Sequence, residues 1–136
     1  MAINDCYWLD INHVEDSRGL LCIMEEGAEI PFSIKRIYFL SQVPLTSGRG
    51  GHAHKELQQV FCAVSGAFTI TVDDGRERQS FVLDNPRKGL YLPKMVWRDI
   101  DGFSDNAVCM VVASELYDEA DYFREYTDFL RAANTE

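Results

Sequence analysis

The sequence predicts an all-β domain of the sandwich or barrel type, followed by one amphipathic helix. Short apolar or alternating runs recur along the chain, and turn-forming residues separate them. Short strands at a spacing of roughly 8–12 residues are typical of β-sandwiches and β-barrels. A single domain is expected, with the barrel over about residues 5–113 and strands at 20–24, 33–41, 58–64, 67–72, 78–84, 90–93 and 107–113.

Turn residues mark the boundaries of these strands. Ser65-Gly66 separates two runs rich in β-forming residues and predicts a hairpin. Asp73-Asp74-Gly75 and Asn85-Pro86 predict two further turns. The segment 46–51 is rich in glycine and serine, so it is expected to be the most flexible part of the chain.

The hydrophobic period changes near the C-terminus. Between Asp118 and Ala133, aromatic and apolar residues recur at helical spacing, at Tyr122, Phe123, Tyr126, Phe129 and Leu130. This spacing is typical of one face of an amphipathic helix. We expect a helix over about 118–133, capped by Ser114 or Asp118 and packed on the barrel.

Length, charge and cysteine content bound the class of protein. The chain has 136 residues, the usual size of one domain, and a net charge of −9, which argues against general nucleic-acid binding. It has neither an apolar run of the ~20 residues that a membrane span needs nor a start resembling a signal peptide. Three of the cysteines sit in apolar runs without C-x-x-C pairing. These features predict a cytoplasmic protein without membrane partners.

The most informative motif is a pair of histidines that follows a run of glycines. His52 and His54 are separated only by Ala53, and Gly48, Gly50 and Gly51 precede them. Residues i and i+2 of a β-strand point to the same face, so both imidazoles should reach one cavity. Paired titratable groups in one cavity indicate proton transfer.

This stretch resembles the first motif of the cupin superfamily, whose fold is a jelly-roll or conical β-barrel. His52, His54, Gln59 and Gly66 match the spacing of that motif, but Gln59 stands where the family has a glutamate. In the second cupin motif, Arg98 stands where a histidine ligand is expected. Transition-metal sites need about three histidine or carboxylate ligands, and a guanidinium would repel a divalent cation. We therefore expect no bound metal and no cofactor.

The resemblance narrows to one family of cupins. The runs at 30–36, 49–55, 72–75 and 113–122 resemble the dTDP-4-keto-6-deoxyglucose 3,4-ketoisomerases, from Asp16 to about Leu130. This resemblance implies a homodimer that binds a dTDP-linked 4-keto-6-deoxy sugar and moves its ketone from C4 to C3 without a metal. The product would feed the synthesis of amino-deoxysugars for surface polysaccharides or antibiotics. Arg18-Gly19 resembles the branch of the family that forms the galacto-configured product.

Ketone migration fits these residues chemically. It removes the C3 proton, passes through an enediolate and adds a proton at C4, so it needs groups that titrate near neutrality and a cation for the developing charge. We favour His54 as the C3 base, with His52 orienting it or returning a proton, but the reverse order is equally compatible with the sequence.

Other residues are candidates for holding the substrate. Arg49 is expected to bind the pyrophosphate or to stabilise the enediolate. Tyr38 shares strand parity with Arg36 and is a candidate proton donor. The remaining candidate substrate contacts are Arg18, Arg36, Lys55, Gln59, Trp97 and Arg98, of which Trp97 and Arg98 are expected to close the sugar pocket.

Three alternatives remain open. A cupin with a histidine base can also epimerise a carbon next to a ketone, as dTDP-sugar 3,5-epimerases do. A metal-dependent cupin dioxygenase or isomerase is a second alternative, which Gln59 and Arg98 disfavour. A non-catalytic module that binds sugar nucleotides is the third, and the presence of both His52 and His54 favours catalysis over it.

Overall fold

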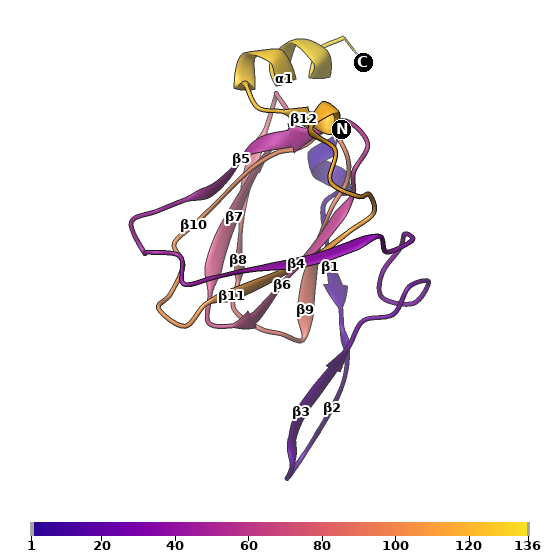
Figure 1. Cartoon of the computed structure of the whole chain (residues 1–136), viewed down its shortest axis with the longest axis vertical. Helices are drawn as coiled ribbons and strands as arrows, with labels where there is room; N and C mark the ends of the chain where they lie inside the picture. The colour runs from indigo at the N-terminus through magenta and orange to yellow at the C-terminus, as the bar shows by residue number, and fades with distance from the viewer. Residues whose placement is uncertain (1, 136) are drawn as a thin grey trace.

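The computed structural model describes residues 2–135 and contains two antiparallel five-stranded sheets that face each other (Figure 1). The first sheet contains, in spatial order, β1 (Tyr7–Asp10), β9 (Lys88–Leu92), β6 (Gln59–Ser65), β11 (Val108–Ala113) and β4 (Arg36–Ser41). The second contains β12 (Tyr122–Phe123), β5 (Arg49–His54), β10 (Trp97–Asp101), β7 (Phe68–Asp73) and β8 (Arg78–Leu83). The expected all-β, jelly-roll architecture is confirmed.

Side chains that alternate between buried and exposed positions along the strands form one core between the two sheets. In β7, Phe68, Ile70 and Val72 are buried while the residues between them are partly exposed, which is the pattern of a strand with one face in a core. The same core contains Phe61 of β6 and Leu90 of β9 from the opposite sheet. This shared core holds the sheets together and leaves a cavity between β5, β10 and β4.

The hairpin expected around Gly66 is wrong, because β6 and β7 lie in different sheets and do not pair. The turn itself is present and joins β6 to β7, and its geometry requires glycine. Gly66 has a φ of +66°, a conformation that other residues rarely adopt. A Cβ at this position would lie 2.4 Å from Ser104 Oγ and 2.8 Å from Ala107 Cα. The loop before β11 therefore packs directly against this turn.

The helix predicted over about 118–133 is wrong in its first half. Residues Glu119–Asp121 form a 3-10 helix, η2, whose N-cap Asp118 accepts a hydrogen bond from Ala120 N. Tyr122 and Phe123 then add to the sheet as β12, in register with His54 and Ala53 of β5. Only Tyr126–Ala133 is helical, as α1. Backbone pairing with β5 overrides the helical pattern. The aromatic residues Tyr122 and Phe123 are compatible with this, because aromatic side chains are also favoured in strands.

The second half of that prediction is confirmed. Phe129 on α1 is fully buried and lies 5.9 Å, between ring centroids, from Trp97 of β10. Tyr126 contacts the same indole edge-on at 5.2 Å. The helix is therefore anchored on the outer face of the sheet that carries the histidines.

A two-stranded hairpin projects from the body of the molecule (Figure 1). It consists of β2 (Asn12–Asp16) and β3 (Gly19–Ile23), which pair only with each other. Every residue of β2 is exposed, including Val14 at 52%, and Leu21 of β3 is exposed at 58%. A hairpin with apolar side chains in solvent is marginal by itself.

The remaining helical segments are short. A 3-10 turn, η1 (Ala2–Asp5), precedes β1. Across residues 2–135, no helix has the length and hydropathy needed to cross a bilayer.

Candidate functional site

The two histidines lie on one face of β5, as the spacing predicts. Their ring centroids are 4.9 Å apart and the rings are nearly perpendicular. His54 is only 1% exposed, whereas His52 is partly exposed and lines a cavity. Because Gly50 has no side chain, β5 can lie close to β10 at this position. A Cβ there would lie only 2.9 Å from the carbonyl oxygen of Arg98. The glycines before the histidines therefore allow close approach of the two strands.

The cavity beside His52 has a volume of about 510 Å³, within the usual range for a small-molecule site. Both sheets and the C-terminal segment contribute polar side chains to its wall: Arg36, Tyr38, Arg49, His52, Gln59, Arg98, Tyr122 and Arg124. A second hollow of about 640 Å³ contains Arg78, Gln79 and Asp101 but neither histidine. We place the candidate site in the smaller cavity, because it gathers the titratable groups and the cations.

A buried guanidinium forms one wall of the cavity. Arg98 of β10 is 1% exposed and pairs with His52 in the strand register. It donates hydrogen bonds to the carbonyl oxygen of Val96, at 3.3 Å from Nε and 3.0 Å from Nη2, and to Oε1 of Gln59. Burial lowers the pKa of Arg98 to about 10, so it stays protonated at neutral pH. A full positive charge is thus held inside the fold.

Arg98 also sets the direction of a hydrogen-bond chain. A guanidinium can only donate, so the oxygen of the Gln59 amide must face Arg98 and its NH₂ group must face the other way. That NH₂ group donates to the Tyr38 hydroxyl at 2.9 Å. The Tyr38 oxygen is therefore an acceptor in this bond, and its own hydrogen remains free for another partner. Burial raises the pKa of Tyr38, which keeps the phenol protonated.

Burial and the charge of the same guanidinium keep both histidines neutral. Burial, followed by the charge of Arg98, lowers the pKa of His52 to about 4 and that of His54 to about 2. Arg124 adds to the lowering at both histidines. At neutral pH, each ring therefore has one nitrogen that can accept a proton.

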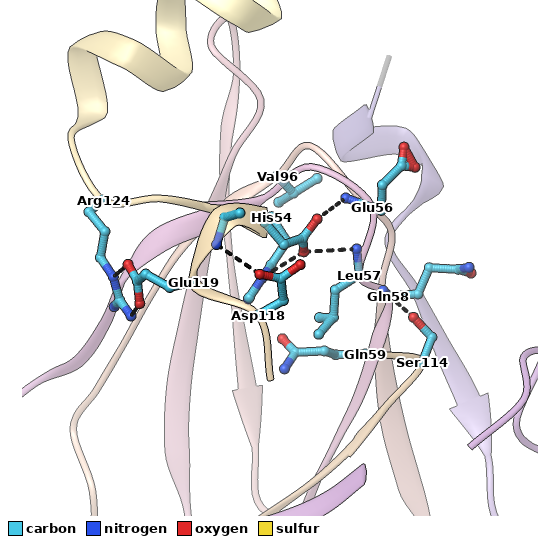
Figure 2. Close-up of polar contacts among 12 residues, drawn as sticks. His54, Glu56, Leu57, Gln58, Gln59, Val96, Ser114, Asp118, Glu119 and Arg124 are labelled. Carbon is cyan, nitrogen blue, oxygen red and sulfur yellow. Dashed lines mark hydrogen bonds and ion pairs between the residues drawn. The ribbon is translucent and has the colours of Figure 1, made fainter. Parts of the chain in front are cut away.

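The free nitrogens are buried without a hydrogen-bond partner within residues 2–135. They are Nδ1 of His52 and Nε2 of His54. The other nitrogen of His54, Nδ1, lies 3.2 Å from Oδ2 of Asp121 (Figure 2). Buried polar atoms are rarely left unpaired, so these two nitrogens are candidates for contacting a ligand.

These residues do not fit a metal ion. At the cupin ligand positions, the oxygen of Gln59 already accepts from Arg98, and the guanidinium occupies the place of a histidine ligand. A divalent cation there would lie beside a buried positive charge. Within the described part of the chain, no group of three or more His, Cys, Asp or Glu is placed to hold a metal.

Several predicted substrate contacts do line the cavity. Gln59 and Arg98 lie in its wall, and Arg49 is an exposed residue at its rim. Arg36 also lines it, with its guanidinium carbon 5.3 Å from the centroid of the Tyr38 ring. The strand parity that placed Arg36 and Tyr38 on one face is therefore confirmed.

Other predicted contacts lie elsewhere. Trp97 alternates with Arg98 along β10, so its side chain points outward and anchors α1. Lys55 is exposed and lies over Phe123, 5.3 Å from the ring centroid. Arg18 lies at the turn of the projecting hairpin, paired with Asp16 at 2.7 Å, and its side chain is 87% exposed. Within one chain, these three residues do not join the wall of the cavity.

Sequence reasoning missed the contribution of residues 121–124. The Tyr122 ring lies 5.1 Å from the His52 ring and 4.4 Å from the His54 ring, between centroids. The Arg124 guanidinium lies 4.0 Å from the Tyr122 ring centroid and pairs with Glu119. The aromatic spacing of this segment predicts a helix packed on the barrel. The one sequence signal that could have pointed to a functional role is the resemblance of the run 113–122 to the ketoisomerase family.

Replacement of Arg98 by methionine is expected to raise the pKa of His52 from about 4 towards the ordinary value of 6.5, because the nearby cation is removed. Titration of the histidine ring signals by NMR measures the shift. Arg49→Met is the control, since Arg49 is exposed at the rim and is not among the charges that shift His52. An unchanged His52 pKa in Arg98→Met would contradict the electrostatic role of Arg98.

Comparison with known proteins identifies the family. A family model described as FdtA, WxcM-like, C-terminal matches residues 4–134. The chain is 43% identical over 121 residues to TDP-4-oxo-6-deoxy-alpha-D-glucose-3,4-oxoisomerase of Aneurinibacillus thermoaerophilus, covering 89% of this chain and 87% of that protein.

Solved structures agree. A 3,4-ketoisomerase from Helicobacter canadensis has a TM-score of 0.93 at 42% identity and covers 96% of this chain and 98% of its own. A histidine-to-asparagine mutant of the 3,4-ketoisomerase QdtA from Thermoanaerobacterium thermosaccharolyticum, in complex with TDP-4-keto-6-deoxyglucose, has a TM-score of 0.94 at 34% identity, covering 96% of this chain and 95% of that one. The chain therefore belongs to the FdtA, WxcM-like family.

Proposed function

We propose that this protein is a dTDP-4-keto-6-deoxyglucose 3,4-ketoisomerase that works by proton transfer without a metal. The observation that carries the proposal is a pair of neutral histidines next to a cavity whose wall holds a buried guanidinium and a phenol with a free hydrogen. A relative named as a TDP-sugar 3,4-oxoisomerase and a ketoisomerase solved with a TDP-keto sugar support the substrate class.

The reaction needs four proton movements. The C3 proton leaves, the C4 carbonyl oxygen gains a proton, the C3 hydroxyl loses one, and C4 gains one. The intermediate is an enediol or enediolate, so bases and donors must face both carbons. The cavity offers the His52 imidazole on β5 and the Tyr38 hydroxyl on β4, and the His54 ring lies against that of His52 with its Nε2 buried.

We assign the C3 base to His52. This reverses the order favoured from the sequence, because His52 lines the cavity whereas His54 is more deeply buried. A neutral His52 takes the C3 proton and becomes an imidazolium, which can return the proton to C4. His54 supplies the second acceptor.

Tyr38 and Arg98 act on the oxygen atoms. The free hydrogen of Tyr38 is directed by Gln59, so it can donate to the C4 carbonyl oxygen as negative charge develops there. Arg98 supplies a fixed positive charge that is almost wholly buried, and such a charge stabilises a developing anion more strongly than one in bulk water. Arg36, Arg49 and Arg124 line the same cavity and suit a pyrophosphate, because guanidinium groups bind such oxygens in pairs.

The galacto-configured product belongs to the proposal on the basis of the Arg18-Gly19 resemblance, and a place in amino-deoxysugar synthesis on the basis of the family resemblance. A 3-keto product is the carbonyl substrate that an aminotransferase needs. The galacto product requires proton delivery to the face of C4 that places its hydroxyl axially.

The test is proton NMR of dTDP-4-keto-6-deoxyglucose in deuterium oxide with catalytic protein and EDTA. We expect the C3 signal to disappear and a 3-keto product to form, and the C4 proton coupling of the early product that still carries a proton at C4 gives its configuration. His52→Asn should slow turnover by about 10²- to 10⁴-fold, the usual contribution of a general base. His13→Asn is the matched control, since His13 is an exposed histidine on β2 outside the cavity.

Other spectra would point to other functions. Inversion at C3 or C5 with the ketone retained at C4 would favour an epimerase. Binding of the nucleotide sugar without exchange or product would favour a non-catalytic module. Activity that EDTA abolishes would contradict the metal-free proposal.

We also propose that the protein is a homodimer. β4 is an edge strand, and its outward side chains Ile37 and Phe39 are exposed at 58% and 67%. Exposed apolar edges favour pairing with another chain, and the projecting β2–β3 hairpin adds Val14 and Leu21 to the apolar surface. In a dimer, the hairpin would also carry Arg18 away from its own chain towards a neighbour.

Light scattering at micromolar concentration is expected to give twice the mass of one chain. Phe39→Glu should shift the protein towards monomer, because it places a charge in the covered apolar surface. Val82→Glu is the control, since Val82 is exposed at 58% on β8 of the other sheet. A monomeric wild type, or an equal effect of both variants, would contradict the dimer surface.

A further inference from the structure

Asp121 is the carboxylate nearest to the histidine pair, and it has no part in the proton transfers proposed for the substrate. It lies at the end of η2, immediately before β12, and 67 residues after His54 in the chain. Its Oδ2 is 3.2 Å from Nδ1 of His54, and the His54 and Asp121 side chains are 1% and 13% exposed. The contact is thus almost wholly inside the protein.

The carboxylate is itself fixed by the backbone that follows β5. Oδ1 accepts from Glu56 N at 2.9 Å and Oδ2 accepts from Leu57 N at 3.3 Å (Figure 2). The main chain of Asp121 is also held, because its carbonyl oxygen accepts from Lys55 N at 2.8 Å. Four hydrogen bonds therefore tie Asp121 to residues 54–57, and the carboxylate has little freedom to turn away from His54.

The backbone of His54 is held from two sides as well. Its carbonyl oxygen accepts from Met95 N at 2.8 Å, and Tyr122 pairs with it across the β5–β12 register. The Tyr122 ring lies against the imidazole, 4.4 Å between centroids. Ring orientation and backbone position are therefore both restricted.

We infer that Asp121 is a positioning residue, which holds His54 in the Nδ1–H tautomer and leaves Nε2 as the proton acceptor. An ionised carboxylate only accepts hydrogen bonds, so the atom facing it must carry hydrogen. A neutral imidazole carries one hydrogen, so Nε2 has a lone pair, and this nitrogen is buried without a partner within residues 2–135. The role assigned to His54 rests on the proposed function, whereas the tautomer does not.

The Asp121 carboxylate can also balance a positive charge on His54. Burial disfavours a positive charge on His54, and so do four neighbouring groups: Arg98, His52, Arg36 and Arg124. If Nε2 takes a proton, the resulting imidazolium must be balanced by a nearby negative charge. Asp121 is in contact with the ring and supplies that charge, in the way that an aspartate supports the histidine of a hydrolase triad.

The test compares Asp121→Asn with Asp118→Asn. Asparagine has nearly the same shape as aspartate. Its NH₂ group would, however, face one of the three groups that donate hydrogen bonds to the Asp121 carboxylate, so the variant should disturb the His54 tautomer. Asp118 caps the same turn through Ala120 N and touches neither histidine. Asparagine caps as well as aspartate, so its variant controls for removing a carboxylate from this turn without contact to His54.

Two readouts are required. In ¹⁵N-histidine NMR spectra, the wild type should show His54 as the Nδ1–H tautomer, and Asp121→Asn should shift it towards Nε2–H. In turnover assays, Asp121→Asn should lower kcat by about 10²- to 10⁴-fold with little change in KM, as loss of a histidine's orienting partner does elsewhere. Asp118→Asn should keep the tautomer and remain within a few-fold of the wild-type kcat.

An unchanged His54 tautomer and kcat in Asp121→Asn would overturn the inference. Equal losses in both variants would also overturn it, since the effect would then come from the turn rather than the carboxylate. If the wild type does not isomerise the dTDP-sugar, the proposed function fails, but the tautomer spectra still decide whether Asp121 positions His54.

Discussion

The buried charge of Arg98 is the constraint on which the rest of the site depends. A guanidinium inside a protein must be hydrogen-bonded, and Arg98 uses the Val96 carbonyl oxygen and the Gln59 amide oxygen for this purpose. That choice orients Gln59, and Gln59 in turn orients the Tyr38 hydroxyl. The same charge lowers the pKa of both histidines. One residue thus prepares a donor on β4 and two acceptors on β5.

This arrangement explains the departures from the metal-binding cupin pattern. A glutamate at position 59 would pair with Arg98, but it would accept hydrogen from Tyr38 instead of donating to it. A histidine at position 98 would not hold a permanent charge. Gln59 and Arg98 therefore act together. A metal-binding cupin site holds a metal cation, whereas this site carries its positive charge on the Arg98 side chain.

Much of the fold could be predicted from local patterns. The turn at Gly66 and the shared face of His52 and His54 follow from turn chemistry and strand period, which act over a few residues. The turn does not form the expected hairpin, because the sheet that each flanking strand joins is decided by distant partners. The positions of Gln59 and Arg98 in one wall followed from motif spacing. The turn and the histidine pair depend on a few neighbouring residues. Gln59 and Arg98 stand out because they differ from the residues that the cupin motifs have at those positions.

The residues at 118–125 could not be predicted in this way. Their aromatic spacing fits a helix. The structure is instead decided by hydrogen bonds that the backbone N–H groups of residues 55–57 donate to Asp121, and by strand pairing of Tyr122 with His54. These contacts join positions more than 60 residues apart, so no local period reveals them. Likewise, the alternation that sends Arg98 inward sends Trp97 outward to α1, which motif comparison alone did not distinguish.

The most direct test of the account is the kcat of Gln59→Glu on dTDP-4-keto-6-deoxyglucose with EDTA present, together with its affinity for TDP. The account predicts a folded protein that binds TDP normally, because a carboxylate at position 59 can still pair with Arg98. Its kcat should fall by about 10²-fold or more, as expected when a general acid is lost, because Tyr38 would donate to the carboxylate and not to the substrate. A kcat equal to that of the wild type would contradict the claim that Arg98 and Gln59 direct the Tyr38 hydrogen.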